Sequence, residues 1–146
     1  MTDSKPAIDV LFYVLNSTEP DKREQFLSKL LKKILSEKRH CDVRFEQLQE
    51  AQRFDLTLWD YQPQSFIVHS IENAIAAPIQ LHGKQIHKPC NDVLVNLHTE
   101  FPQMFANYVR TIEILDQSEH LVKMARERWK AYKAQGLEPK VHKIGF

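Results

Sequence analysis

Glycine is scarce in this sequence. The 146 residues contain three glycines, at positions 83, 136 and 145, where an average protein of this length has about ten. Loops that cradle phosphate need several glycines at fixed spacing, as in GxGxxG or GxxxxGK[ST], because only glycine lets the backbone approach the phosphate so closely. Neither pattern can be assembled from three distant glycines. The two commonest phosphate-binding loops are therefore excluded.

Cysteine and long apolar runs are also scarce. The two cysteines, Cys41 and Cys90, do not make a disulfide framework, so we expect a reducing compartment. The longest apolar run covers residues 10–15, whereas a membrane-spanning helix needs about twenty apolar residues. Residues 1–6 lack the apolar core of a signal peptide. These absences predict a cytoplasmic protein with no membrane partner.

Neither sign of charge is in excess. Twenty Lys and Arg face nineteen Asp and Glu, which gives a net charge of +1. A nucleic-acid coat protein would be far more basic, so any electrostatic partner has to be recognised by a local patch. The length and the 42% of hydrophobic residues suit one globular domain with its own core. We expect residues 1–146 to form that single domain.

The spacing of apolar residues predicts alternating strands and helices. Strands are predicted at 8–15, 41–45, 66–69, 78–82, 92–98 and 110–116, and helices at 21–37, 47–58, 101–108 and 118–135, before an extended tail. The strand–helix–strand–helix–strand order of the first half favours parallel pairing with helices packed on the sheet. The predicted fold is a single three-layer α/β domain, with a mixed, mostly parallel sheet and helices on both faces.

Histidines and a cysteine gather in one segment, which raises the question of a metal site. His82, His87 and Cys90 fall within nine residues, and His98 lies nearby. The spacing H-x4-H-x2-C does not match a common zinc framework, and no CxxC pair is present. A polar surface loop at 82–91 is the simpler interpretation.

Cys41 lies in a predicted strand, where free cysteine is usually buried and inert. We therefore predict no metal, no cofactor and no catalytic residue.

The helix at 118–135 carries a basic stripe. At 100° per residue, Lys123, Arg126, Lys130 and Lys133 share one side, edged by Val122 and Trp129. Arg128 points instead towards the predicted buried side. The stripe suits an acidic peptide that ends in an apolar residue, or a phosphate backbone. A solvated face that complements the helix dipole would explain the charges alone. Trp129 favours binding, because Trp and Arg are enriched at interface hot spots.

A second aromatic feature is the segment LWDYQPQSF at 58–66. Trp59 and Tyr61 follow a predicted helix, in a proline-containing loop that leads into a strand. Two large aromatic residues in a loop either fill the core or form a partner surface. The pattern leaves both interpretations open.

Five segments together resemble the chi subunit of bacterial DNA polymerase III. They are FYVL at 12–15, LWDYQPQSF at 58–66, VHS at 68–70, DVLVNL at 92–97 and MARERWKAY at 124–132. The segments occur in the family's order and span nearly the whole chain, and LWxxxPxSF and ARER(W/Y)KAY are specific to it. The resemblance implies a fold like that of mononucleotide-binding domains, with no nucleotide required. This agrees with the missing glycine loops.

The resemblance also implies a function. Chi is a non-catalytic accessory subunit of the replicase that pairs with the psi subunit as a heterodimer, and psi ties it to the clamp-loader complex. Chi also binds the acidic C-terminal tail of single-stranded DNA-binding protein. The expected role is a link between the clamp loader and the protein-coated template strand.

The family's binding residues carry over by position. Arg126, the first arginine of ARER, corresponds to the arginine that binds the tail. The resemblance implies that Lys123 and Arg126 take the tail's charge, and that Leu115, Val122 and Trp129 line an apolar pocket. Lys130 is a further residue of the predicted tail-binding site. Family members often have Tyr at the position of Trp129, so this pocket differs in shape. Some members have Lys at the position of Val122, and the resemblance leaves open whether Lys123 substitutes for that lysine. Trp59, Pro63 and Phe66 match the psi-facing surface, where a helicase-type partner is a further candidate.

Two other functions were weighed against this one. A nucleotide- or metal-dependent α/β hydrolase would need a phosphate loop, a ligand set or a nucleophile elbow, and the sequence offers none of them. Direct binding of single-stranded DNA by the stripe at 123–133 is weakly supported, because the net charge is +1 and the stripe has one aromatic residue. On this basis we expect little or no direct DNA binding.

Overall fold

A computed structural model describes residues 8–60 and 67–146. In the described ranges the chain forms seven strands, three α-helices and one 3-10 helix. In chain order these elements are β1 (Asp9–Leu15), α1 (Pro20–Ser36), β2 (Cys41–Arg44), α2 (Leu48–Asp60), β3 (His69–Ile71), β4 (Ile79–His82), β5 (Val93–Asn96), η1 (Gln103–Asn107), β6 (Arg110–Leu115), α3 (Glu119–Ala134) and β7 (Lys140–Ile144).

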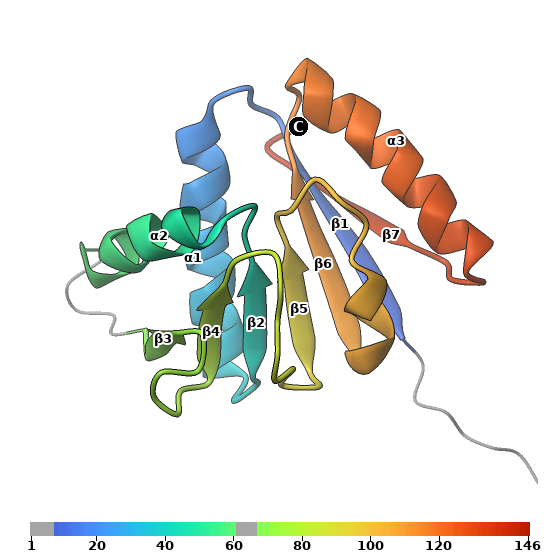
Figure 1. Cartoon of the computed structure of the whole chain (residues 1–146). Coiled ribbons are helices and arrows are strands. Elements are labelled where there is room, and N and C mark those ends of the chain that lie inside the picture. The colour runs from blue at the N-terminus through green and yellow to red at the C-terminus, as the bar shows by residue number, and fades with distance from the viewer. Residues whose placement is uncertain (1–7, 61–66) are drawn as a thin grey trace, which may run out of the picture.

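The strands form one sheet in the order β3-β4-β2-β5-β6-β1-β7 (Figure 1). Every adjacent pair is parallel. The predicted α/β class is confirmed, and the sheet is wholly parallel rather than mixed. The tail that was expected to be extended supplies β7, which pairs with β1 so that Tyr13 lies beside His142. Because α3 carries the chain back across the sheet after β6, β7 runs in the same direction as the other strands.

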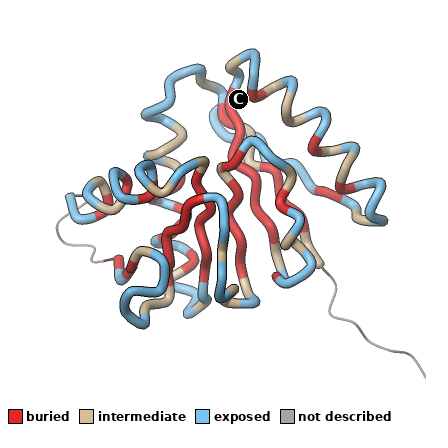
Figure 2. The backbone as a smooth tube through the Cα atoms, in the orientation of Figure 1, coloured by how far each residue is buried: buried red, intermediate tan, exposed pale blue. Residues whose placement is uncertain are grey.

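Helices cover both faces of the sheet. The larger core lies under α1 and α2, and a smaller core lies under α3 around Phe12, Leu115 and Tyr132. Figure 2 shows the buried strands at the centre, with exposed residues on the helices and loops. Alternation along β6 divides its side chains, since Ile112 and Ile114 join the larger core and Leu115 the smaller one. The long apolar run of β1 reflects burial on both faces.

Two predicted elements differ from the structure. The strand expected at 66–69 is β3, which begins at His69, the first residue that pairs with β4. Apolar composition placed its start earlier, but pairing decides where a strand begins; Phe66 lies outside the described residues. The short helix expected at 101–108 is the 3-10 helix η1, and Pro102 precedes it. The remaining strands and helices agree with prediction to within a few residues.

The face of the sheet on the α3 side is unusually polar. Its buried side chains include Asp42, Arg44, Gln80, His82, Asn96 and Glu113. Asp42 accepts hydrogen bonds from the Tyr108 hydroxyl (2.8 Å) and the Cys90 backbone N–H (2.9 Å), and its Oδ1 lies 3.0 Å from His82 Nε2. The loops at 83–92 and 98–108 supply several of these partners. The expectation that His82 belongs to a polar surface loop is therefore wrong, because it ends β4 and is buried.

Candidate partner-binding surfaces

Local sequence fixes α3 at both ends. Ser118 is the N-cap residue, and its backbone N–H donates to Asp116 Oδ1 at 2.9 Å. Glu119 in the first turn and Lys133 in the last turn both complement the helix dipole. Gly136, just after the end, has φ +84°, a conformation that favours glycine. Leu121 and Tyr132 on the inner side pack into the core under the helix.

The outer side of α3 brings together five of the six residues predicted to bind the tail. We call Val122, Lys123, Arg126, Trp129 and Lys130 the α3 surface. The three cationic residues are exposed, while Val122 and Trp129 are half-buried. The Trp129 ring packs edge-on against Phe12, with centroids 5.5 Å apart. The sixth residue, Leu115, is 2% exposed and lies in the core beneath the helix. The surface is thus cationic, with an apolar margin anchored in the core.

Arg128, two residues after Arg126, has a different environment. It is buried, and its Nη1 donates to both carboxylate oxygens of Glu113, at 3.0 and 2.9 Å. Its Nη2 donates to the Thr99 carbonyl at 2.6 Å. Burial raises the pKa of Glu113, although Arg128 and the Tyr132 hydroxyl both act in the opposite direction. Arg128 therefore anchors α3 to the sheet, as its predicted inward direction requires.

Arg126 has no such partner. Within the described ranges, no carboxylate forms an ion pair with Arg126, Lys123 or Lys130. Their charges face solvent and can meet an acidic ligand without breaking an internal contact. The tail-binding role of the α3 surface stays a prediction, since no ligand tests it.

A second surface lies around the end of α2 and the edge strand β3. We call Trp59 and Leu56, which lies three residues earlier on the same helix, the Trp59 surface. Val68 before β3 and Ile75 after it are two further exposed aliphatic residues. Leu56, Trp59 and Ile75 are each more than half exposed. The Trp59 ring lies 5.0 Å from the ring of His69, which is held between Asp55 Oδ1 (2.8 Å) and the Ile67 carbonyl (2.7 Å). Trp59 is thus a positioned, exposed ring and does not fill the core. Pro63 and Phe66 lie outside the described residues.

The two surfaces lie at opposite ends of the sheet. Strand β3 is one edge and β7 the other, and α3 connects β6 to β7. Figure 1 shows α2 and β3 on the left and α3 and β7 on the right. Two macromolecular partners can therefore approach without competing for the same elements.

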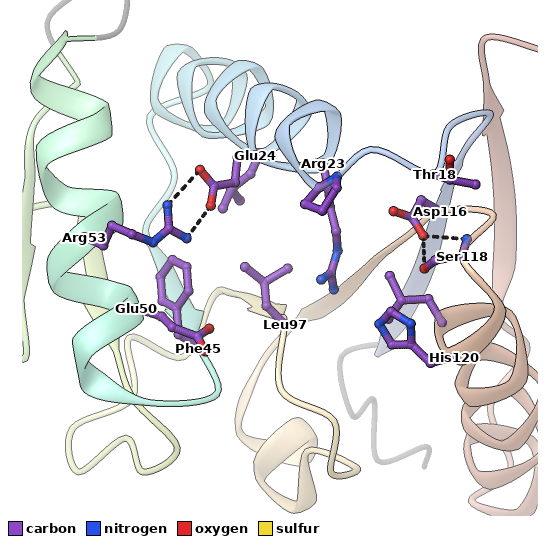
Figure 3. A pocket seen from close by; sticks show the side chains of 13 residues that line it. Thr18, Arg23, Glu24, Phe45, Glu50, Arg53, Leu97, Asp116, Ser118 and His120 are labelled. Atoms are coloured by element: carbon purple, nitrogen blue, oxygen red, sulfur yellow. Dashed lines mark hydrogen bonds and ion pairs between the residues drawn. The ribbon is translucent and has the colours of Figure 1, made fainter.

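A cleft of about 450 Å³ lies between these surfaces. It includes side chains from α1, α2 and the start of α3, with Leu97 after β5 and Asp116 after β6 (Figure 3). In parallel α/β sheets this carboxyl edge is where ligands usually bind. Here both arginines already have partners within the chain: Arg53 forms an ion pair with Glu24, and Arg23 Nε donates to the Ile114 carbonyl at 2.8 Å. Burial lowers the pKa of Arg23, although Asp116 raises it.

The start of α1 is also poorly suited to phosphate. In nucleotide-binding folds a glycine loop and a helix N-terminus hold the phosphate after β1. Here residues 16–19 contain no glycine. Glu19 is the N-cap residue, and Asp21 lies in the first turn. These carboxylates would repel a phosphate at the place where the hydrolase alternative needs one.

The residues that the sequence offered as metal ligands or as cysteine nucleophiles do not form a reactive site. Across residues 8–60 and 67–146 there is no group of three His, Cys, Asp or Glu that could hold a metal. Cys41 is fully buried, and burial raises the pKa of the Cys90 thiol to about 12, so neither is poised as a thiolate nucleophile. The helices of the described ranges include none with the length and apolar character to span a bilayer.

Comparison with known proteins gives one consistent result. The family profile described as "DNA polymerase III chi subunit, HolC" matches residues 8–140. This chain belongs to the DNA polymerase III chi subunit family. The chi subunit of Pseudomonas aeruginosa is 29% identical over 136 residues, which cover 91% of this chain and 94% of that protein. The chi subunit of Haemophilus influenzae is 24% identical over 139 residues, 92% of this chain and 96% of that protein. The chi subunit of Escherichia coli K12 is 26% identical over 98 residues, 64% of this chain and 67% of that protein.

Membership of the chi family supports an accessory role in DNA replication. Within that family, sequence reasoning missed two features of the candidate surfaces. It did not single out Leu56, which widens the exposed apolar area beside Trp59. Nor did it connect Arg128 to Glu113. The i, i+3 spacing of Leu56 and Trp59 on one helix could have shown the first feature. The second needed knowledge of which strand lies beneath α3.

Proposed function

We propose that this chain is a non-catalytic accessory subunit of the DNA polymerase III holoenzyme, which joins the clamp loader to the coated template strand. The psi subunit would bind at one end of the sheet and the acidic C-terminal tail of single-stranded DNA-binding protein at the other. The observation that carries the proposal is the presence of two exposed surfaces of different chemistry at opposite ends of one sheet. The protein would act in the cytoplasm at the replisome.

The α3 surface has the chemistry for an acidic tail with an apolar end. The Arg126 guanidinium would take a carboxylate through paired N–H donors, and Lys123 and Lys130 would hold further acidic residues. Val122 and Trp129 would contact the apolar side chain. Leu115 is buried below them and would support the floor of this contact. Because the cations are exposed, the affinity should fall as salt rises.

The Trp59 surface has the chemistry for psi. Exposed aromatic and aliphatic side chains that cluster on one surface are typical of the centre of a protein interface. By the family resemblance Pro63 and Phe66 would extend it. A heterodimer with psi would bury this area, and a helicase-type partner would use the same side chains in competition.

A peptide titration tests the tail site. A peptide copy of the tail is added to the full chain at low and moderate salt, with binding followed by calorimetry and tryptophan fluorescence. We expect micromolar binding that weakens with salt, is lost in Arg126→Ala and is unchanged in Trp59→Ala. The converse holds for psi, which should co-purify with Arg126→Ala and not with Trp59→Ala.

Three results would count against the proposal. If the wild-type chain does not bind the peptide, it is not a tether. If Arg126→Ala binds as well as the wild type, the tail site lies elsewhere. If Trp59→Ala still co-purifies with psi in normal yield, the psi surface is misplaced.

A further inference from the structure

Within the described residues, the β7 edge of the sheet has hollows that neither proposed partner uses. On the face where α1 and α2 pack, the two strands at the β7 edge carry Tyr13, Lys140 and His142. Two hollows, of about 590 and 330 Å³, lie in succession between α1 and β7. The first reaches Ile144 of β7, and the second reaches Lys140 and His142. We call them together the α1–β7 groove.

One stripe of α1 forms the wall of this groove. Lys22, Phe26, Lys29 and Lys33 are spaced i, i+4, i+7 and i+11, which places them within one narrow arc of the helix. All four line the two hollows. From Lys22 to Lys33 the helix rises about 16 Å. Lys140 lies opposite on β7, so that lysines border the groove on both sides.

Aromatic rings lie between these lysines. The Tyr13 ring is 5.0 Å from Phe26 and 5.4 Å from His142, and the Tyr13 and His142 rings are stacked, at an interplanar angle of 30°. His142 is exposed, whereas Tyr13 and Phe26 are half-buried. The outer face of the His142 ring is therefore presented to solvent on a rigid support.

Most acidic groups near the groove already have partners. Asp9 pairs with Arg110 at 3.1 Å, and Glu138 lies 3.9 Å from Lys133. Glu19 lies at one end of the first hollow. In contrast, Lys22, Lys29, Lys33 and Lys140 form no ion pair with any residue that the structure describes. Four lysines without an ion-pair partner among the described residues therefore line the α1–β7 groove.

We propose that the α1–β7 groove binds single-stranded DNA. Lysines along a track neutralise successive phosphates, and a supported ring stacks on an unpaired base without regard to sequence. A duplex hides its base faces from such a ring, and an acidic peptide makes no use of it. The replication role of the family makes single-stranded DNA the polyanion that the protein meets. This departs from the expectation of little direct DNA binding, which rested on net charge and on α3 alone.

Salt dependence of binding tests the proposal. A fluorescently labelled oligothymidylate of about 15 nucleotides is titrated with the full chain alone at pH 8 and several salt concentrations, and anisotropy is recorded. Each neutralised phosphate of a single strand contributes about −0.7 to the slope of log K against log salt, so four lysines predict a slope of about −3. Lys29→Gln with Lys33→Gln should reduce the slope to about −1.4.

The stacking ring is tested by a second variant. His142→Ala should weaken binding at least about fivefold, the low end for one base-stacking contact, and leave the slope unchanged. The matched control is Lys84→Gln with Lys88→Gln, which removes two lysines from the loop at 83–92, outside the groove. This control should keep the wild-type slope.

Three outcomes would overturn the proposal. The first is no binding by the wild type at low salt. The second is an equal reduction of slope in the control, which would show a response to total charge. The third is displacement of the DNA by oligoglutamate of the same charge at equal concentration. That result would make the groove a site for acidic peptides.

Discussion

At the residue scale, the most informative contrast is between two arginines on α3. Arg126 is exposed and has no ion-pair partner within the described ranges, whereas Arg128 is buried against Glu113. Glu113 is itself 1% exposed and also accepts hydrogen bonds from Tyr132 Oη (2.7 Å) and from the Asn96 side-chain amide. Removing one partner of a buried ion pair leaves the other charge without compensation, which costs far more than losing a surface charge.

Alanine at each arginine should separate stability from binding. Arg128→Ala should lower the free energy of unfolding by about 3–5 kcal/mol, because Glu113 loses its buried counter-charge. Arg126→Ala should change it by no more than about 0.5 kcal/mol. Urea unfolding followed by circular dichroism measures both. Equal losses in the two variants would contradict the structure. Adding Glu113→Gln to Arg128→Ala should recover part of the loss.

The two arginines and Trp59 show how much of a side chain's environment can be predicted from the sequence. Helix geometry alone predicted that Arg126 faces outward and Arg128 inward, because 3.6 residues per turn fix their relative directions. It could not identify Glu113 as the partner, since that residue lies on a strand that only the folded sheet brings under α3. The exposure of Trp59 was also undecidable, because the sequence placed it in a loop after the helix, whereas it lies in the last turn of α2.

At the element scale, apolar periodicity predicted the helices and every strand except β7, but not the polar face of the sheet. The alternation in β2, Cys41-Asp42-Val43-Arg44, shows two different faces. The alternation does not show that loops from further along the chain cover the polar face. His82 was placed in a surface loop for the same reason. Burial of such residues depends on partners like Tyr108 and Cys90 that lie tens of residues away.

One carboxylate joins the turn between α1 and β2 to β5 and should make stability depend on pH. Asp92, just before β5, accepts hydrogen bonds from Arg39 Nε and the His40 backbone N–H, both at 3.1 Å, and so ties the α1–β2 turn to β5. Burial acts to raise the pKa of Asp92, but these hydrogen bonds outweigh it and hold the pKa below its ordinary value of 3.8. The stabilisation is therefore fully present above about pH 4 and is lost as the pH falls through the lower native pKa.

Asp92→Asn should lower the free energy of unfolding at pH 7 by about 1 kcal/mol, a value reduced because the pair is partly exposed. The difference from the wild type should shrink below about pH 4, where Asp92 takes up a proton in the unfolded chain before it does so in the native one. Urea unfolding at a series of pH values measures this. Glu127→Gln, which removes an exposed carboxylate on α3, should show no such convergence. A constant difference down to pH 2 would contradict the role given to Asp92.

At the scale of the whole molecule, the two candidate surfaces are separated by the width of the sheet. Sites this far apart, with no shared side chains, are expected to contribute independently. The affinity for the tail peptide should therefore change by less than about twofold when psi is already bound. Calorimetric titration of the peptide into the isolated chain and into the preformed complex with psi measures this. A tenfold change, or mutual exclusion, would show that the surfaces are coupled or overlap.

The order of the strands in the sheet could not be predicted from the sequence. The pattern of elements predicts an α/β sheet, but it does not say that β7 pairs with β1 or that α1 and β7 border one groove. Those contacts join residues more than a hundred positions apart, such as Tyr13 and His142. The family resemblance predicted the general fold but not this local arrangement, since β7 lies largely beyond the specific motifs.

The position of β1 has a consequence for how the protein is made. Both of its neighbours, β6 and β7, come from the last third of the chain. At about 5–20 residues per second, ribosomes would take roughly 5–25 s after β1 to supply them. During that time the most apolar strand of the protein has two open edges, which favours aggregation. Although β1 precedes the other six described strands, it is among the last to be paired, so we expect the nascent chain to collapse first around β2, β4 and β5.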